Sequence, residues 1–221
     1  MSFKNFTAER YRPEIDGLRA LAVIAVIINH FNKDFLPSGY LGVDIFFVIS
    51  GYVITNSFRY RQSYSFKEFL LSFYERRIKR IIPGLIFFVL IMSLLSCLFI
   101  SLPGTSLWTA LTSLFGVSNF YLFRQNTAYF AESTQLNVFT NTWSLGVEEQ
   151  FYFIFPLITW FTGFNQQKNK SEKLLFILLL FLSFLSLISF IYLYQVNQPF
   201  AYFMVPTRFW EMATGSMIFL I

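Results

Sequence analysis

Two long uncharged runs constrain the fold of this chain more than any other feature of its sequence. They are Ile81–Leu102 and Leu174–Tyr194, and both are predominantly apolar. Each has at least the length, about 20 residues, with which an α-helix crosses the hydrocarbon core of a bilayer. Because that core offers no water to unpaired backbone groups, a spanning segment has to satisfy its backbone internally, as a helix does. The sequence therefore predicts a membrane protein built from helices.

The composition supports lipid as the solvent for much of the chain. Of the 221 residues, 55% are hydrophobic and 13% are charged, against about 25% charged in an ordinary soluble domain. A soluble core of this length cannot bury so much apolar surface. The net charge of +5 does not indicate a nucleic-acid partner, because the basic residues cluster between the apolar runs, as they do in membrane proteins.

The other apolar runs carry ionisable residues or are weaker, and we expect most of them to span the membrane as well. They are Leu18–Phe31, Tyr40–Asn56, Leu107–Phe123, Trp143–Phe164 and a run that begins near Phe209. We predict an all-α, polytopic transmembrane helical bundle with about six to seven spans, one of them interrupted. Because the last run is cut at Ile221, we expect residues 1–221 to be one integral-membrane domain that is incomplete at its C-terminus.

The basic residues set the expected orientation. Seven of them fall between the second and third runs: Arg59, Arg61, Lys67, Arg76, Arg77, Lys79 and Arg80. Loops rich in Lys and Arg stay in the cytoplasm, so with two spans before this loop the N-terminus is predicted to be cytoplasmic too. Arg19 then lies near the inner end of the first span, and His30 lies near its outer end.

The loop Asn165–Lys173 is also basic, which again favours the cytoplasm. This placement conflicts with Leu107–Phe123 as a full span, because the number of crossings would then put the loop outside. Either Leu107–Phe123 is re-entrant, or the Lys-rich loop is an exception to the rule. We favour the re-entrant interpretation.

Arg19 and His30 are ionisable residues in the first apolar run, where such groups are costly and often functional. They are eleven residues apart and three helical turns take about 10.8 residues, so both lie on one stripe, roughly 16 Å apart along the axis. They cannot touch, but they can line one passage at two depths. Asp16, three residues before Arg19, can pair with it. The alternative is that His30 reaches the interface and Arg19 is an inner anchor.

His30 is the only histidine in the chain, and histidine is the side chain best suited to accept a proton near neutral pH. One histidine and one cysteine cannot build a zinc site, so no metal centre is expected. The sequence also has no G-x-S-x-G elbow and no P-loop. Acid–base chemistry in the first span would therefore depend on His30.

The basic stretch Tyr74–Arg80 runs into Pro83 and has two interpretations. It is either an inside anchor for the third span or a phosphate clamp, since arginine matches phosphate oxygens with paired hydrogen bonds. In the second case Arg76, Arg77 and Arg80 would meet a phosphorylated ligand from the cytoplasm.

Two adjacent acidic residues, Glu148 and Glu149, stand at the entrance of the Trp143–Phe164 run. Adjacent residues on a helix point about 100° apart, so at most one of them faces a given cavity. Arg208 and Glu211 are three residues apart, which an internal ion pair explains. For both pairs a structural role is the expected one.

Five blocks, taken in order, resemble the acyltransferase-3 family of integral-membrane O-acyltransferases. They are Tyr11–Ala20, Tyr40–Tyr52, Phe73–Pro83, Asn141–Pro156 and Tyr202–Gly215. The family's signature of an arginine, ten residues and a histidine falls on Arg19 and His30. In one departure, Asn141 and Thr142 precede Trp143 where a histidine is common in the family, so no second catalytic histidine is expected there. The resemblance implies a larger core of roughly ten spans.

The resemblance also implies that an acyl group, usually acetyl, passes from cytoplasmic acyl-CoA to a hydroxyl of a cell-envelope saccharide, in a bacterial-type inner membrane. Acetyl-CoA would be a donor substrate, not a permanently bound cofactor. His30 would be the general base on the acceptor hydroxyl, and Asp16 would orient Arg19, which binds or polarises the donor. A covalent acyl-enzyme relay is the alternative to direct transfer, although no residue identifies its nucleophile. The other candidates are catalytic Glu148 and Glu149, donor-binding Arg76, Arg77 and Arg80, and substrate-binding or structural Asp44, Trp143, Arg208 and Glu211.

Two other functions fit the same residues. A non-enzymatic transporter could relay protons through His30 and Asp44. A structural or regulatory subunit could have lost catalysis, in which case removing the charge of Arg19 or Glu148 would leave envelope acylation unchanged. Donor use separates the enzyme from the transporter, because only the enzyme moves label from acyl-CoA to a glycan.

Overall fold

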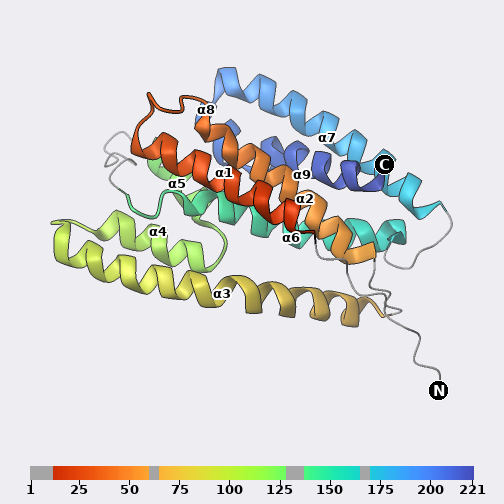
Figure 1. Cartoon of the computed structure of the whole chain (residues 1–221), viewed down its shortest axis with the longest axis horizontal. Coiled ribbons are helices and arrows are strands. Elements are labelled where there is room, and N and C mark those ends of the chain that lie inside the picture. The colour runs from red at the N-terminus through yellow and green to blue at the C-terminus, as the bar shows by residue number, and fades with distance from the viewer. Residues whose placement is uncertain (1–11, 60–64, 128–136, 165–169) are drawn as a thin grey trace. The chain divides into compact units, whose positions relative to one another are not determined.

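The computed structural model describes residues 12–59, 65–127, 137–164 and 170–221 (Figure 1). Tyr11, Arg61 and residues 165–169 of the Lys-rich loop lie outside the described residues. The helices are α1 (Pro13–Phe31), a short 3-10 helix η1 (Gly39–Leu41), α2 (Gly42–Arg59), α3 (Phe66–Phe99), α4 (Gly104–Leu114), α5 (Ser118–Thr127), α6 (Thr142–Thr162), α7 (Ser171–Val196), α8 (Gln198–Phe203) and α9 (Val205–Leu220). The described residues contain no strand, which confirms the all-α prediction.

Three helical segments among the described residues are long and apolar enough to cross a membrane: Gly39–Arg59, α3 and α7. They support a multi-pass membrane protein, while the other predicted spans stay predictions. α1 is not among the three apolar segments because it carries Glu14, Asp16 and Arg19 within a helix of only 19 residues. Charged residues lower the mean hydropathy of a segment, although they do not by themselves keep a helix out of a membrane.

An uncovered apolar stripe on α3 supports contact with lipid. Phe87, Leu90, Leu94 and Leu98 are between 63% and 67% exposed. Their spacing of three or four residues puts them on one face of the helix. A continuous apolar face of this kind is stable against hydrocarbon, whereas a soluble monomer seldom leaves it open to water.

The chain folds into two compact units. The first comprises Met1–Ser63, Ile158–Ser183 and Trp210–Ile221, and the second comprises Tyr64–Leu157 and Phe184–Phe209. Helices α6, α7 and α9 each contribute residues to both units. The candidates of the first helix therefore belong to the first unit, and those of the basic stretch and the acidic pair belong to the second.

In the first unit, α1 and α2 form an antiparallel hairpin (Figure 1). A Cβ added at Gly39 would lie 2.4 Å from the Ala25 carbonyl oxygen, and one added at Gly42 would lie 2.3 Å from that of Ala22. The two backbones approach this closely only because glycine has no side chain. This contact fixes the relative register of α1 and α2.

A second close crossing in the first unit joins α2 to α9. A Cβ added at Gly51 would lie 1.9 Å from the Met212 carbonyl oxygen, and one added at Gly215 would lie 1.7 Å from that of Val48. The Ser216 hydroxyl donates a hydrogen bond to the Gly51 carbonyl at 3.2 Å. Small residues and hydroxyl-to-backbone bonds are typical of helix association in lipid, where packing rather than water drives the contact.

In the second unit, α3 begins ahead of the predicted span Ile81–Leu102 and runs through Pro83 to Phe99. Its 34 residues make it about 51 Å long, against about 30 Å for the hydrocarbon core. The basic stretch is therefore part of a helix that extends beyond the hydrocarbon, and not part of a loop. Sequence reasoning defined the span by its lack of charge, whereas Lys, Arg and Glu form helices well and continue α3 into the polar region.

α6 runs antiparallel to α3 in the second unit. The Tyr74 hydroxyl donates to the Phe153 carbonyl at 3.4 Å, and the ring centroids of Phe88 and Phe139 are 5.7 Å apart. The earlier residue of α3 is thus paired with the later residue of the second segment, which is the antiparallel order. Phe139, just before α6, therefore lies beside the C-terminal half of α3.

The segment Leu107–Phe123 lies between α3 and α6 in the sequence and is interrupted. It is divided into α4 and α5 by a turn at Gly116, whose φ of +66° suits glycine. α4 lies along α3 (Figure 1), with Ala110 in one apolar cluster with Leu85 and Val89. Helices of 11 and 10 residues are too short to cross, since crossing takes about 20. The arrangement favours the re-entrant interpretation of this segment.

Candidate functional site

His30 lies in the last turn of α1 and its side chain is exposed. Its Nδ1 atom is 2.8 Å from the Val26 carbonyl oxygen. Because a carbonyl can only accept, this hydrogen bond places the proton on Nδ1, and the lone pair of the neutral imidazole is then on Nε2. In the neutral ring, Nε2 is thus the nitrogen that can accept a proton, as a general base requires.

Asn29, the neighbour of His30, is buried and was not predicted as a site residue. Its amide donates to the carbonyl oxygens of Leu36 and Pro37 at 2.8 and 3.2 Å. These bonds tie the turn after α1 to the end of the helix, so the backbone that carries His30 is held in place. No sequence pattern distinguishes this asparagine, because its partners are backbone atoms of a turn.

Arg19 is half-buried and lies over the ring of Phe46 on α2, with its Cζ atom 5.0 Å from the ring centroid. This is within the range of a cation–π contact. No hydrogen bond or ion pair joins Arg19 to Asp16 within residues 12–59, and Asp16 is exposed. The predicted contact between them is therefore not formed in this structure. An aromatic ring from the next helix, which spacing along α1 cannot reveal, holds the guanidinium instead.

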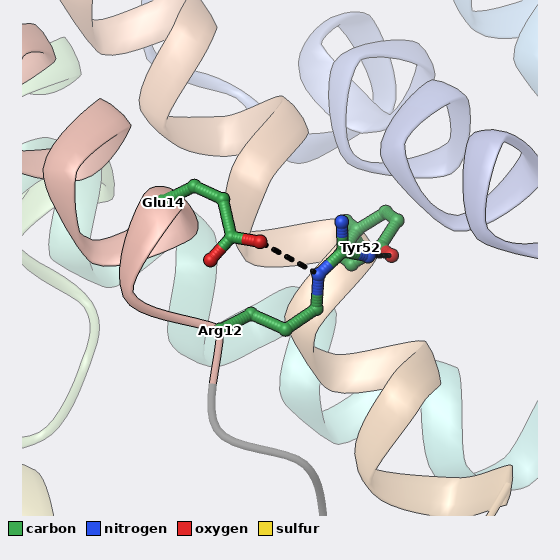
Figure 2. A network of polar contacts seen from close by, with 3 residues as sticks. All are labelled: Arg12, Glu14 and Tyr52. Atoms are coloured by element: carbon green, nitrogen blue, oxygen red, sulfur yellow. Dashed lines mark hydrogen bonds and ion pairs between the residues drawn. The ribbon is translucent and has the colours of Figure 1, made fainter.

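A polar network at the N-terminal end of α1 was also not predicted (Figure 2). The Arg12 guanidinium donates a hydrogen bond to the Tyr52 hydroxyl of α2, and its Nε atom lies 3.7 Å from the Glu14 carboxylate. These residues come from the first two blocks that carry the family resemblance, and the hairpin brings those blocks together. Only the pairing of α1 with α2 reveals the contact, because Arg12 and Tyr52 are 40 residues apart.

In the second unit, Arg77 of α3 lies against two aromatic rings. Its Cζ atom is 5.6 Å from the ring centroid of Phe73 and 4.6 Å from that of Tyr152 on α6. The Tyr152 hydroxyl donates a hydrogen bond to the carboxylate of Glu148, which is only 6% exposed. Two predicted candidates, Arg77 and Glu148, are thus connected through Tyr152, which sequence reasoning did not single out.

Glu149 has different neighbours from Glu148. Its Oε2 atom would lie 2.2 Å from a Cβ added at Gly116, so it packs against the turn between α4 and α5. The Gln150 amide donates to the Gly116 carbonyl at 2.9 Å and to the Asn119 side-chain oxygen at 2.8 Å. The two adjacent acids therefore face different partners, as expected from the rotation of about 100° between consecutive helical residues.

Arg208 is buried among aromatic side chains of the second unit. Its Cζ atom is 5.6 Å from the ring centroid of Trp143, 5.2 Å from that of Tyr202 and 5.7 Å from that of Phe190. Its Nε atom donates to the Tyr202 carbonyl at 3.2 Å. Two of the predicted candidates, Arg208 and Trp143, thus share one cluster, which fits a structural role. The ion pair of Arg208 with Glu211 stays a prediction.

The remaining candidates are Asp44 on α2, Glu211 on α9, and Arg76 and Arg80 on α3. Asp44 is half-buried in the first turn of α2, where the helix dipole favours a carboxylate. Glu211 is fully buried in α9. On the basic extension of α3, Arg76 is half-buried and Arg80 is exposed.

Comparison with known proteins gives a family match over nearly the whole chain. The model of an acyltransferase domain, that of the acyltransferase-3 family, matches residues 12–221. The O-acetyltransferase OatA of Staphylococcus aureus (strain NCTC 8325 / PS 47) is 42% identical over 153 residues, which are 69% of this chain and 25% of that protein. The peptidoglycan O-acetyltransferase OatA of Listeria monocytogenes serovar 1/2a (strain ATCC BAA-679 / EGD-e) is 40% identical over 158 residues, which are 67% of this chain and 24% of that protein. The chain thus spans about a quarter of the length of these curated relatives. No solved structure matches it.

Proposed function

Since this chain belongs to the acyltransferase-3 family, we propose that the whole protein is a membrane O-acetyltransferase. Its donor is cytoplasmic acetyl-CoA, and its acceptor is a hydroxyl group of a cell-envelope saccharide. The name of the Listeria relative supports peptidoglycan as that saccharide. The family match carries the proposal, and the Nε2 lone pair that the Val26 hydrogen bond leaves on His30 supports its chemistry.

The membrane arrangement is part of the same proposal. The protein lies in an inner membrane with its N-terminus on the cytoplasmic side. This chain supplies about six to seven spans of a core of roughly ten. The basic extension of α3 then stands on the cytoplasmic side, as the positive-inside rule expects. There Arg76, Arg77 and Arg80 meet a donor that arrives from the cytoplasm.

In the proposed reaction, Nε2 of His30 takes the proton of the acceptor hydroxyl as the hydroxyl oxygen forms a bond to the acetyl carbonyl carbon. The bond between that carbon and the CoA sulfur breaks, and the departing thiolate takes that proton from the imidazolium, which restores neutral His30 and releases CoA. Arg19, whose guanidinium lies over the ring of Phe46, binds the donor at the inner depth of the same passage.

The basic stretch gives a direct test of donor binding. Arg76→Ala and Arg77→Ala should each raise the KM for acetyl-CoA by at least about tenfold, because each removes a charged donor to a phosphate, worth roughly 1.5–3 kcal/mol. The KM for the acceptor glycan should change less. Steady-state kinetics on membranes that contain the full-length protein measure both constants.

Lys67→Ala is the matched control for these two variants. Lys67 is an exposed cation in the first turn of the same helix, and its loss should leave both KM values unchanged. Equal effects of the Arg76 and Arg77 variants on donor and acceptor would count against a phosphate clamp and would favour a general loss of charge at the membrane surface.

A proton-coupled transporter is the main alternative. His30 in the last turn of α1 and Asp44 in the first turn of α2 stand at the same end of the hairpin, where a relay could join them. Proton-coupled flux without acetyl transfer would support this function. A subunit without catalysis predicts instead that Arg19→Gln and Glu148→Gln leave envelope acetylation at its wild-type level.

A further inference from the structure

Arg77 is held differently from its neighbours in the basic stretch. Lys79 forms an ion pair with Glu75 on the same helix, at 2.6 Å. Arg77 is instead half-buried, with its guanidinium over the rings of Phe73 and Tyr152. The two rings meet edge to face, with centroids 6.3 Å apart and planes at 84°. They form a corner in which the guanidinium of Arg77 rests.

This way of holding Arg77 leaves its hydrogen-bond donors available. A cation–π contact uses none of the N–H donors, which lie along the edge of the planar guanidinium. No hydrogen bond or ion pair joins Arg77 to another residue in the part of the chain that the structure describes. The edge can therefore form paired hydrogen bonds with a phosphate group.

Glu148 acts on the corner through Tyr152. The Tyr152 hydroxyl donates to the buried Glu148 carboxylate, one turn earlier on α6. A hydrogen bond to a charged acceptor is strong, so it fixes the plane of the phenol. By drawing the phenolic proton away, it also makes the ring richer in electrons and a better partner for a cation. Glu148 forms no ion pair with Arg77 among the described residues, so the carboxylate does not occupy the guanidinium edge.

We propose that Tyr152 and Glu148 are positioning residues that hold Arg77 ready for a phosphate group of the acyl-CoA donor. This role rests on the proposed function, because Arg77 has to bind the donor for it to matter. It gives Glu148 a task other than acid–base catalysis. The carboxylate orients the tyrosine, and the tyrosine orients the cation that touches the donor.

Kinetics on membranes with the full-length protein test this role with two conservative variants. Tyr152→Phe keeps the ring and removes the hydroxyl, and Glu148→Gln keeps the shape and removes the charge. Each should raise the KM for acetyl-CoA about fivefold and leave kcat and the acceptor KM unchanged, because each weakens one hydrogen bond behind the cation–π contact. The KM for acetyl-N-acetylcysteamine, a donor without phosphate groups, should stay at its wild-type value.

Coupling to Arg77 separates positioning from a merely structural effect. In an Arg77→Ala background, Tyr152→Phe and Glu148→Gln should raise the donor KM no further, because the cation that they position is absent. Tyr74→Phe is the matched control for the hydroxyl, since Tyr74 donates to the Phe153 carbonyl and not to Glu148. Glu68→Gln, at an exposed position of α3, is the control for the charge. Both controls should behave as wild type.

Four results separate the possibilities. A further rise in donor KM on top of Arg77→Ala, or a loss of kcat at unchanged donor KM, would overturn the positioning role. Wild-type kinetics of Tyr152→Phe and Glu148→Gln, with a raised donor KM in Arg77→Ala, would also overturn it but leave the phosphate clamp intact. An unchanged donor KM in Arg77→Ala would refute the clamp itself.

Discussion

Replacing His30 with alanine is expected to abolish acetyl transfer and leave the protein folded. A general base contributes about 10²–10⁴-fold to a rate, and the chain has no other histidine to take its place. The hydrogen bond from Nδ1 to the Val26 carbonyl directs Nε2 to this task. Because the His30 side chain is exposed, its loss removes no buried contact. Transfer of label from acetyl-CoA to glycan measures the effect.

Phe31→Ala provides the control for this prediction. Phe31 follows His30 and is 87% exposed, so truncating it also removes side-chain atoms from the end of α1 but no titratable group. It should retain transfer, and both variants should reach the membrane in wild-type amounts. If His30→Ala keeps wild-type transfer, the base is another group and the proposed mechanism is wrong.

Gly215→Ala is expected to have the largest effect on stability. A Cβ at this position would lie 1.7 Å from the Val48 carbonyl oxygen, and the nearby Gly51 leaves equally little room, at 1.9 Å from the Met212 carbonyl oxygen. Backbone atoms on a helix cannot move aside as a flexible side chain can, so α2 and α9 would have to separate. Overpacking typically costs about 1–3 kcal/mol, and a clash with backbone atoms that cannot yield belongs at the upper end of this range. Thermal unfolding of the full-length protein in detergent measures the loss.

Gly84→Ala tests whether the effect comes from the crossing and not from the substitution. Gly84 lies inside α3, and an added Cβ there would meet nothing within 4 Å. The same change should therefore be neutral, or stabilising by up to about 1 kcal/mol, because alanine favours helix more than glycine does. Equal destabilisation by the two variants would show that the loss comes from the substitution itself and not from the crossing of α2 and α9.

The elements that sequence predicts well are those whose signal is local. The uncharged runs locate the apolar parts of α3 and α7, because the hydrocarbon core selects for length and lack of charge. The start of α3 at Phe66 escaped this criterion, since a helix can continue in polar surroundings where no apolar signal marks it. The break at Gly116 was expected only as an interruption, because its turn depends on contacts with α6.

The site shows the same division between local and distant signals. Spacing predicts that Glu148 and Glu149 diverge, and they do, because helical rotation alone decides it. Spacing also predicts a contact between Asp16 and Arg19, which is not formed, because the Phe46 ring of another helix lies under the guanidinium. Tyr152 could not be selected from sequence, since its partner Arg77 is on a different helix.

One measurement tests the central claim most directly. Membrane vesicles that contain the full-length protein are supplied with radiolabelled acetyl-CoA and peptidoglycan, and alkali-labile label is recovered from the glycan. The proposed function predicts label in the glycan with the wild-type protein and none with His30→Ala, at equal amounts of protein in the membrane. Label that never leaves acetyl-CoA, in vesicles that carry proton-coupled flux, would contradict the proposed transfer and favour a transporter.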